Sequence, residues 1–155
     1  MKLKPDFCVK YNFKGSSIGL LAVEVKLPNP HSSQVLSDRS KLGLELKRMV
    51  DEQIIQGSYE PKSFGVLVEG FRCTFFGCSL DRSGCYLFVE LEKHWLLQSP
   101  DDMMLIPDLV VVFMKIKVAI IEVVGKLNKR IKQDKALNAS VKPTVGLPTK
   151  RASNL

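Results

Sequence analysis

The segment Ile18–Lys26, with the sequence IGLLAVEVK, constrains the fold of this chain more than any other part. Its run of apolar and β-branched residues is typical of a buried strand, and the run ends in a carboxylate and an ammonium group. Because successive side chains of a strand alternate between its faces, Glu24 and Lys26 point to the same face. Burying two charges is costly unless they pair with each other, with a third group or with a metal ion. The segment therefore predicts a strand whose buried end carries a polar site.

A second strand is predicted just upstream, at Phe7–Phe13. The four residues Lys14–Ser17 are predicted to form the turn between the two strands, and Gly15 can adopt the positive φ that such a turn needs. The N-terminal third of the chain is therefore expected to begin with an antiparallel hairpin.

The register of this hairpin decides where Asp6 lies. If Phe13 pairs with Ile18, Asp6 lies opposite Val25, between the two charged residues of the second strand. A slip of one residue in either direction places Asp6 opposite one of the charged residues, and only a slipped register places it on their face. The sequence leaves the register open, but in each case an aspartate, a glutamate and a lysine meet at one end of the hairpin.

This set of residues resembles a known motif. Pro5-Asp6 followed by Glu24-Val25-Lys26 is similar to the signature of the PD-(D/E)xK nuclease superfamily, which has a restriction-endonuclease-like core, and the chain resembles uncharacterised fungal proteins predicted to have that core. The resemblance covers residues 4–97. It implies an α/β fold in which a mixed β-sheet is flanked by helices. The helix that leads into the motif in that superfamily is expected to be missing here, because only Met1–Lys4 precede the motif.

The resemblance also implies a metal site and its chemistry. Asp6 and Glu24 would hold one or two Mg²⁺ or Mn²⁺ ions together with the backbone carbonyl of Val25, since hard cations prefer oxygen ligands. Lys26 would orient or activate the attacking water, or stabilise the developing negative charge. The implied function is hydrolysis of phosphodiester bonds in DNA, or in RNA, by an enzyme that could derive from a mobile element.

Two other interpretations stay open. The site could have decayed in a chain that keeps the fold, which would leave a catalytically inactive module that binds nucleic acid or protein. Alternatively, Glu24 and Lys26 could be solvated residues on an edge strand, with Asp6 close to the chain end. The nuclease-like core, which is expected to lack its leading helix, could be completed either by a second copy in a homodimer or by an N-terminal segment absent from this chain.

A helix is expected from the N-cap Ser37 to Gln56, followed by Gly57 at the C′ position. Its predicted buried face consists of Leu42, Leu46, Met49, Val50 and Ile54. Its predicted solvent side carries surface pairs at Asp38–Lys41 and Arg48–Glu52, with Glu45 between them. Lys41 is also our candidate for a polar side chain that this helix offers to the active strand and to nucleic acid.

Three further strands are predicted at Phe64–Glu69, Arg72–Leu80 and Tyr86–Leu91, with a hairpin turn at Asp81–Gly84. A strong helix start at Ser99–Asp102 is interrupted by Pro107, so that a short turn and then a longer helix from Asp108 to Gln133 are expected. Charged residues interrupt its apolar stretch at Leu105–Gly125, which indicates a largely buried helix on the sheet rather than a membrane span.

The net charge of +7 is concentrated at the C-terminal end. Residues 1–125 contain 15 basic and 15 acidic residues, whereas residues 126–155 contain 8 basic residues and one acidic residue. Such a tail can attract phosphates or can simply be solvated. Our candidates for contact with nucleic acid here are Lys126, Lys129, Arg130 and Lys132.

The length of 155 residues suits one domain, which we expect at residues 1–135, followed by a disordered basic tail at 136–155. No secretory signal is evident, so the chain is expected to be intracellular, in the nucleus or cytoplasm. The four cysteines lack metal-ligand spacing and are expected to be buried thiols. His31 and His94 are far apart in sequence and receive no catalytic role.

Overall fold

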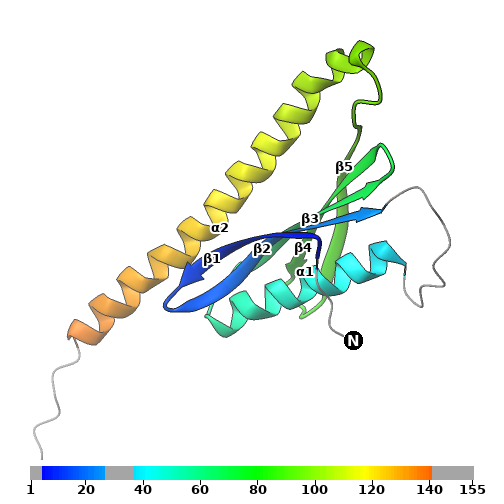
Figure 1. The fold of residues 1–155 in the computed structure, drawn as a ribbon. Helices are drawn as coiled ribbons and strands as arrows, with labels where there is room; N and C mark the ends of the chain where they lie inside the picture. Colours follow the sequence, from blue (N-terminus) through cyan, green and yellow to red (C-terminus); the bar gives the residue numbers. More distant parts are fainter. Residues whose placement is uncertain (1–4, 27–36, 141–155) are drawn as a thin grey trace, which may run out of the picture.

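The computed structural model describes residues 5–26 and 37–140, with the backbone alone for residues 130–140. The chain forms one five-stranded mixed sheet between two helices (Figure 1), so the predicted α/β class is confirmed. Its elements, in order, are β1 (Phe7–Phe13), β2 (Ser16–Lys26), α1 (Asp38–Ile55), β3 (Lys62–Glu69), β4 (Arg72–Leu80), β5 (Tyr86–Trp95), the 3₁₀ helix η1 (Pro100–Leu105) and α2 (Ile106–Ser140).

The strands lie in the sheet in chain order, from β1 to β5. Only β2 and β3 run parallel, because α1 carries the chain back between them; the other neighbours are antiparallel. The predicted positions of β3 and β4 are correct to within two residues, and the turn at Asp81–Gly84 is confirmed by the hydrogen bond from the Asp81 nitrogen to the Cys85 oxygen, at 3.0 Å. β5 continues to Trp95, four residues beyond the expected end.

The hairpin turn is tighter than predicted. It contains only Lys14 and Gly15, with φ of 49° and 80°, and Phe13 pairs with Ser16 rather than with Ile18. Two consecutive residues with positive φ are typical of a type I′ turn, whose twist matches that of the strands it joins. This turn sets the register at the closed end of the hairpin.

A bulge in β2 then changes the register. Val9 pairs with Leu21 and Lys10 pairs with Gly19, so that Leu20 is an extra residue with no partner of its own on β1. A β-bulge of this kind places two successive residues of one strand against a single position of the other. Every residue of β2 beyond the bulge therefore lies on the opposite face from the one that simple alternation would give.

The core shows this reversal directly. Ile18 and Leu20 pack in the hydrophobic cluster under α2, whereas Ala22, two residues further, packs in the cluster under α1. Glu24 and Lys26 follow Ala22 onto the α1 side. The bulge is thus the reason that the charged end of β2 faces a helix able to supply partners for it.

Both ends of α1 are confirmed as predicted. The Ser37 hydroxyl oxygen accepts a hydrogen bond from the Ser40 nitrogen at 3.2 Å, and Gly57 adopts φ of 81° just after the last turn. The Gly57 nitrogen donates to the Ile54 oxygen at 2.7 Å, as in a Schellman motif. Four of the five predicted core residues of α1 are fully buried, and the fifth, Ile54, is partly buried.

Helix α1 approaches the sheet closely because glycines lie beneath it. A Cβ atom at Gly19 would stand 2.6 Å from Cγ of Met49, and one at Gly65 would stand 2.8 Å from Cδ1 of Leu46. Both distances are shorter than carbon atoms tolerate. The two glycines therefore determine how close the polar side of α1 comes to the end of β2.

Helix α2 crosses the other face of the sheet (Figure 1) and differs from its prediction in three ways. It begins at Ile106, with Pro107 in its first turn, and it runs to Ser140 instead of Gln133, so residues 136–140 are helical rather than disordered. The rest of the predicted tail, 141–155, lies outside the described residues. The helix is also not largely buried: one stripe packs on the sheet, at Val112, Ile116, Val123 and Leu127, and Leu109 is buried as well.

The cysteine prediction was correct only in part. All four thiols are free, but Cys85 is exposed and Cys8 is half-buried, while Cys73 and Cys78 are buried. Burial raises the pKa of the Cys73 thiol to about 11.

Among the residues that the structure describes, no helix has the length and apolar character needed to cross a membrane.

Candidate functional site

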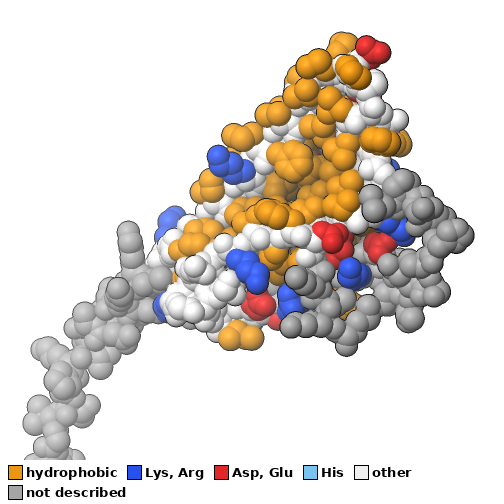
Figure 2. Space-filling model, in the orientation of Figure 1, with side chains coloured by type: hydrophobic (Ala, Val, Ile, Leu, Met, Phe, Trp, Pro, Cys, Tyr) orange, Lys and Arg blue, Asp and Glu red, His pale blue; other side chains and the backbone are white. Residues whose placement is uncertain are grey.

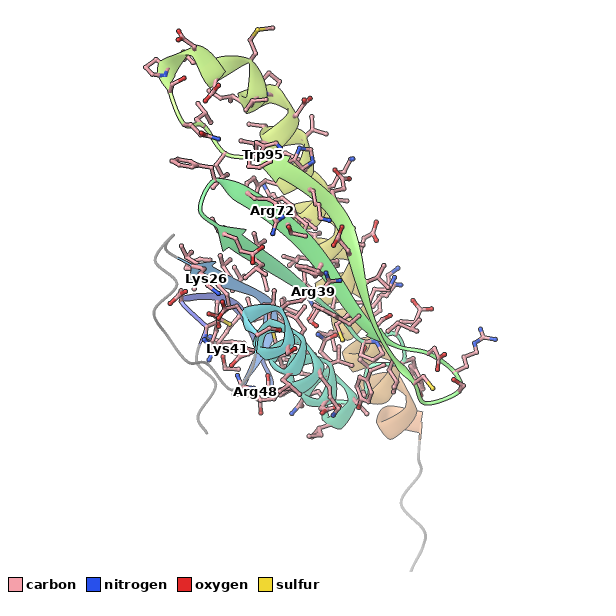
Figure 3. All side chains as sticks on the ribbon, turned by 90° about the vertical axis from the view of Figure 1, so that its right-hand side faces the viewer. Lys26, Arg39, Lys41, Arg48, Arg72 and Trp95 are labelled. Atoms are coloured by element: carbon pink, nitrogen blue, oxygen red, sulfur yellow. The ribbon has the colours of Figure 1, made fainter. Side chains whose placement is uncertain are left out.

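The polar end of β2 lies against one side of α1. The residues on this side recur at helical spacing, at Asp38, Lys41, Glu45, Arg48 and Glu52. Figure 3 shows Lys26, Lys41 and Arg48 following one another along this side of α1, with Arg39 on the other side. The predicted solvent side of the helix therefore faces the β1–β2 hairpin, and we refer to the region where they meet as the carboxylate site.

Glu24 is the centre of the carboxylate site. Its side chain is 6% exposed, and its Oε2 accepts a hydrogen bond from Nζ of Lys41 at 3.0 Å. Its other carboxylate oxygen, Oε1, is buried and has no hydrogen-bond partner among the described residues. Burial raises the pKa of Glu24, while the Lys41 ammonium opposes that rise and Asp6 and Glu45 add to it.

Lys41 lies beside β2, the strand to which the sequence analysis assigned it. Its ammonium bonds Glu24, and the nearby charges of Asp6 and Asp38 also favour its protonated form, so that its pKa is raised. A positive charge in this position is surrounded by three carboxylates. The cation that these carboxylates hold in the structure is the Lys41 ammonium itself.

Asp6 lies at the open side of the carboxylate site. Phe7 pairs with Val23, so the next residues outward, Asp6 and Glu24, are opposite each other, as in one of the two slipped registers. The exposed Asp6 carboxylate accepts a hydrogen bond from the Val25 nitrogen through Oδ2 at 2.8 Å. The structure thus brings Asp6, Glu24 and Val25 together at one end of the hairpin.

Lys26 points to the same helix but makes a different contact. Its Nζ lies 2.7 Å from Oδ2 of Asp38, in the first turn of α1, and this pairing raises the pKa of Lys26. The predicted surface pair between Asp38 and Lys41 was therefore wrong, because each residue pairs with β2 instead. The predicted pair between Arg48 and Glu52 is present, at 3.9 Å.

Glu45 is a residue of the site that the sequence analysis missed. It is 0% exposed, and neither of its carboxylate oxygens has a hydrogen-bond partner among the described residues. The nearest cation is Nη2 of Arg48, at 3.6 Å, and the Arg48 side chain is 53% exposed. The signal in the sequence was its position directly before Leu46, which places Glu45 at the border of the buried face of α1.

The donor set can be compared with the needs of a divalent ion. Among the described side chains, no three histidine, cysteine or acidic groups converge closely enough to hold a metal ion. Two carboxylates and a backbone carbonyl are present, from Asp6, Glu24 and Val25, and Mg²⁺ commonly binds through one or two carboxylates while keeping several waters. Among these oxygens, Oε1 of Glu24 is buried and has no hydrogen-bond partner in the described part of the chain, so it is the atom of the set that could accept a ligand.

The predicted basic contacts on α2 lie far from this site. Lys126 pairs with Glu60, beyond the C-terminal end of α1, whereas Lys41 is in the first turns of that helix. The part of α1 from Lys41 to its end at Ile55 is about 21 Å long at 1.5 Å per residue. Lys126 and Lys129 line a cavity of about 250 Å³ there, together with Tyr59. The side chains of Arg130 and Lys132 lie outside the described part of the structure, as does His31.

Comparison of the chain with family models, with curated proteins and with solved structures finds no match in any of the three. The functional argument therefore rests on the chemistry of the carboxylate site itself.

Proposed function

We propose that the chain is a metal-dependent nuclease that hydrolyses phosphodiester bonds at the carboxylate site. The observation that carries this proposal is the state of Glu24, a buried carboxylate with one oxygen held by the Lys41 ammonium and the other without a partner. Most buried polar atoms have a hydrogen-bond partner, so the unpartnered oxygen of Glu24 is one that a ligand could satisfy. The motif resemblance of Pro5-Asp6 and Glu24-Val25-Lys26 and the hairpin, helix and parallel strand around it support the same chemistry.

Asp6, Glu24 and the Val25 carbonyl would hold Mg²⁺ or Mn²⁺. Such an ion, when bound, polarises a phosphoryl oxygen and lowers the pKa of a bound water. Glu24 would offer the carboxylate oxygen that lacks a partner, and the exposed Asp6 would supply the second carboxylate. Lys41, whose ammonium bonds the other oxygen of Glu24, would hold that carboxylate in place.

Lys26 would act on the negative charge that develops at the reacting phosphate. Its side chain is 45% exposed, and Asp38 fixes its ammonium next to the carboxylate site. Since Asp38 is in the first turn of α1, the helix sets the position of this lysine. The substrate class is DNA, or RNA, because both present the same phosphodiester group to these residues.

A second candidate function is supported by the charge balance of the site. Glu24 is paired with Lys41 and Asp38 with Lys26, so that two of the acidic groups are already neutralised within the chain. A balanced site attracts an added cation less strongly than an unpaired one. In this alternative the chain is an inactive nuclease-like module that binds nucleic acid or protein.

A metal titration of the melting temperature separates the two functions. Under the nuclease proposal, Mg²⁺ or Mn²⁺ raises the melting temperature, and EDTA reverses the rise. At a metal concentration of one hundred times the dissociation constant, the free energy of unfolding should increase by about 2.7 kcal/mol. Glu24→Gln and Asp6→Asn should abolish the rise. The matched control is Glu92→Gln, since Glu92 pairs with Lys115 away from the site. No metal-dependent rise in the unaltered protein favours the inactive module.

Cleavage is then measured on plasmid, single-stranded DNA and RNA with each metal. The expected result is cleavage that Glu24→Gln and Lys26→Met both remove and that the Glu92→Gln control retains. Cleavage that persists in Glu24→Gln would come from a contaminant or another site, and would refute the proposed role of the carboxylate site.

The basic residues on α2 can be tested separately. If Lys126 and Lys129 contact duplex phosphates, replacing both with alanine should reduce the slope of the logarithm of affinity against the logarithm of salt by about 1.8, or 0.9 for each contact. Identical slopes would leave these two lysines without a role in binding nucleic acid.

A further inference from the structure

Helix α2 carries a second apolar stripe, which we call the outer stripe, on the side away from the sheet. It consists of Val111, Met114, Val118 and Ile121, and these residues are 52%, 50%, 51% and 57% exposed. At about 100° per residue, the outer stripe lies on the side of the helix opposite the buried stripe that packs on the sheet. Figure 2 shows hydrophobic side chains along α2, both at the edge of the molecule and in the hollow between the helix and the sheet.

The outer stripe has the spacing of a coiled-coil seam. Its residues are separated by three, four and three positions, which assigns Val111 and Val118 to heptad position a, and Met114 and Ile121 to position d. β-branched residues at a are typical of parallel, two-stranded coiled coils when d is leucine, and here the d positions are Met114 and Ile121. Val110, at a neighbouring g position, is apolar and 53% exposed, so it widens the seam.

The charges beside the outer stripe suit the same parallel arrangement. Lys117 occupies g and Glu122 occupies the e position of the next heptad, and these two positions face each other across a parallel, in-register pair. Neither side chain makes an ion pair within the described part of the chain, and the nearest internal influence of Glu122 is on Lys126, whose pKa it helps to raise. An antiparallel pair would instead bring the e positions together, and Lys115, at e, is already bound to Glu92 of its own chain, at 2.7 Å.

The shape of the molecule leaves this side of α2 accessible. The sheet and α1 lie on the other side of the helix (Figure 1), so two copies can meet along the outer stripe with their bodies pointing apart. From these observations we propose that the chain forms a parallel homodimer through the outer stripe of α2, with Lys117 of each copy paired to Glu122 of the other.

The mass of the full chain in solution tests the dimer. Sedimentation over a range of concentrations should give twice the monomer mass of 17.4 kDa. Val118→Glu should give a monomer with an unchanged circular dichroism spectrum. Val89→Glu is the matched control, because Val89 is also 51% exposed but lies on β5, and it should remain a dimer. If the unaltered chain is a monomer at every concentration, the proposal is overturned. This holds also if the monomer binds lipid vesicles, because the outer stripe would then dock on a membrane surface and not on a second copy.

Two further variants test the orientation. Lys117→Glu places like charges at both symmetric contacts and should raise the dimer dissociation constant about tenfold, and adding Glu122→Lys should restore it. Val118→Cys, made with Cys85→Ser, should form a disulfide-linked dimer on mild oxidation, because equal a positions meet only in a parallel pair. A dimer that the charge exchange leaves unaffected and that Val118→Cys does not link overturns the parallel arrangement. These measurements are independent of cleavage.

Discussion

The contact between Lys41 and Glu24 gives the most specific prediction about the carboxylate site. Lys41→Met removes the ammonium and leaves a 6% exposed carboxylate without its partner. Removing one partner of a buried ion pair commonly costs about 3 kcal/mol or more, because the remaining charge stays desolvated. Since a quarter of the Lys41 side chain is exposed, we expect the lower end of that range, a loss of about 3 kcal/mol at pH 8.

The pH dependence of this loss identifies its cause. Burial already raises the pKa of Glu24 above its usual 4.5, and removing Lys41 takes away the main influence that lowers it, while Asp6 and Glu45 continue to raise it. The folded state then binds a proton that the unfolded state has lost. The free energy of unfolding of Lys41→Met is therefore highest below the pKa of Glu24 in the unfolded chain. It falls as pH rises through the higher pKa of Glu24 in the folded chain, by up to about 1.4 kcal/mol per pH unit.

Urea unfolding followed by circular dichroism at pH 5.5 and pH 8 measures this effect. The deficit of Lys41→Met should be clearly smaller at pH 5.5, where Glu24 can be neutral. Lys93→Met is the control, because its pair with Glu90 is exposed and its removal should produce no pH-dependent loss. An equal deficit at both pH values would refute the argument that an unpaired Glu24 charge causes the loss.

Three other predictions follow from the core and the thiols. Gly65→Ala should reduce the free energy of unfolding by about 1–3 kcal/mol, because the new Cβ would stand 2.8 Å from Leu46; urea unfolding checks this. Glu45→Met should raise that free energy by about 1–3 kcal/mol, because it removes a buried carboxylate without a hydrogen bond, and a decrease would contradict its present lack of partners. Iodoacetamide at pH 8 should modify Cys85 before Cys73, whose thiol is buried with a pKa of about 11; mass spectrometry of the peptides gives the order.

Much of the fold could be predicted because local chemistry determines it. Ser37 and Gly57 mark the ends of α1, and Gly15 marks the hairpin turn. The bulge could not be predicted, because Leu20 and Leu21 lie in a continuous apolar run where an extra residue leaves no trace in the pattern. The register of Asp6 depended on that bulge and on the two-residue turn, so it remained open.

The two helices show a different limit. Glu45 and its polar neighbours repeat at helical spacing, which is equally expected for a solvated side and for a side that faces a polar strand end. In α2 the apolar residues form two opposed stripes, as at Ile116 and Val118, and composition alone suggested that all of them were buried. Periodicity shows which residues share a face of a helix, but the surface that covers that face depends on the rest of the fold.

The bulge at Leu20 has a consequence for how this protein can vary. Glu24 and Lys26 lie on the α1 side only because one extra residue reverses the alternation of β2 before them. Loss or gain of a single residue between Ser16 and Glu24 would move both charges under α2 and would present Val23 to α1 instead. The carboxylate site should therefore accept many exchanges of side chain in that segment, but a change in its length by one residue would dismantle the site in a single step.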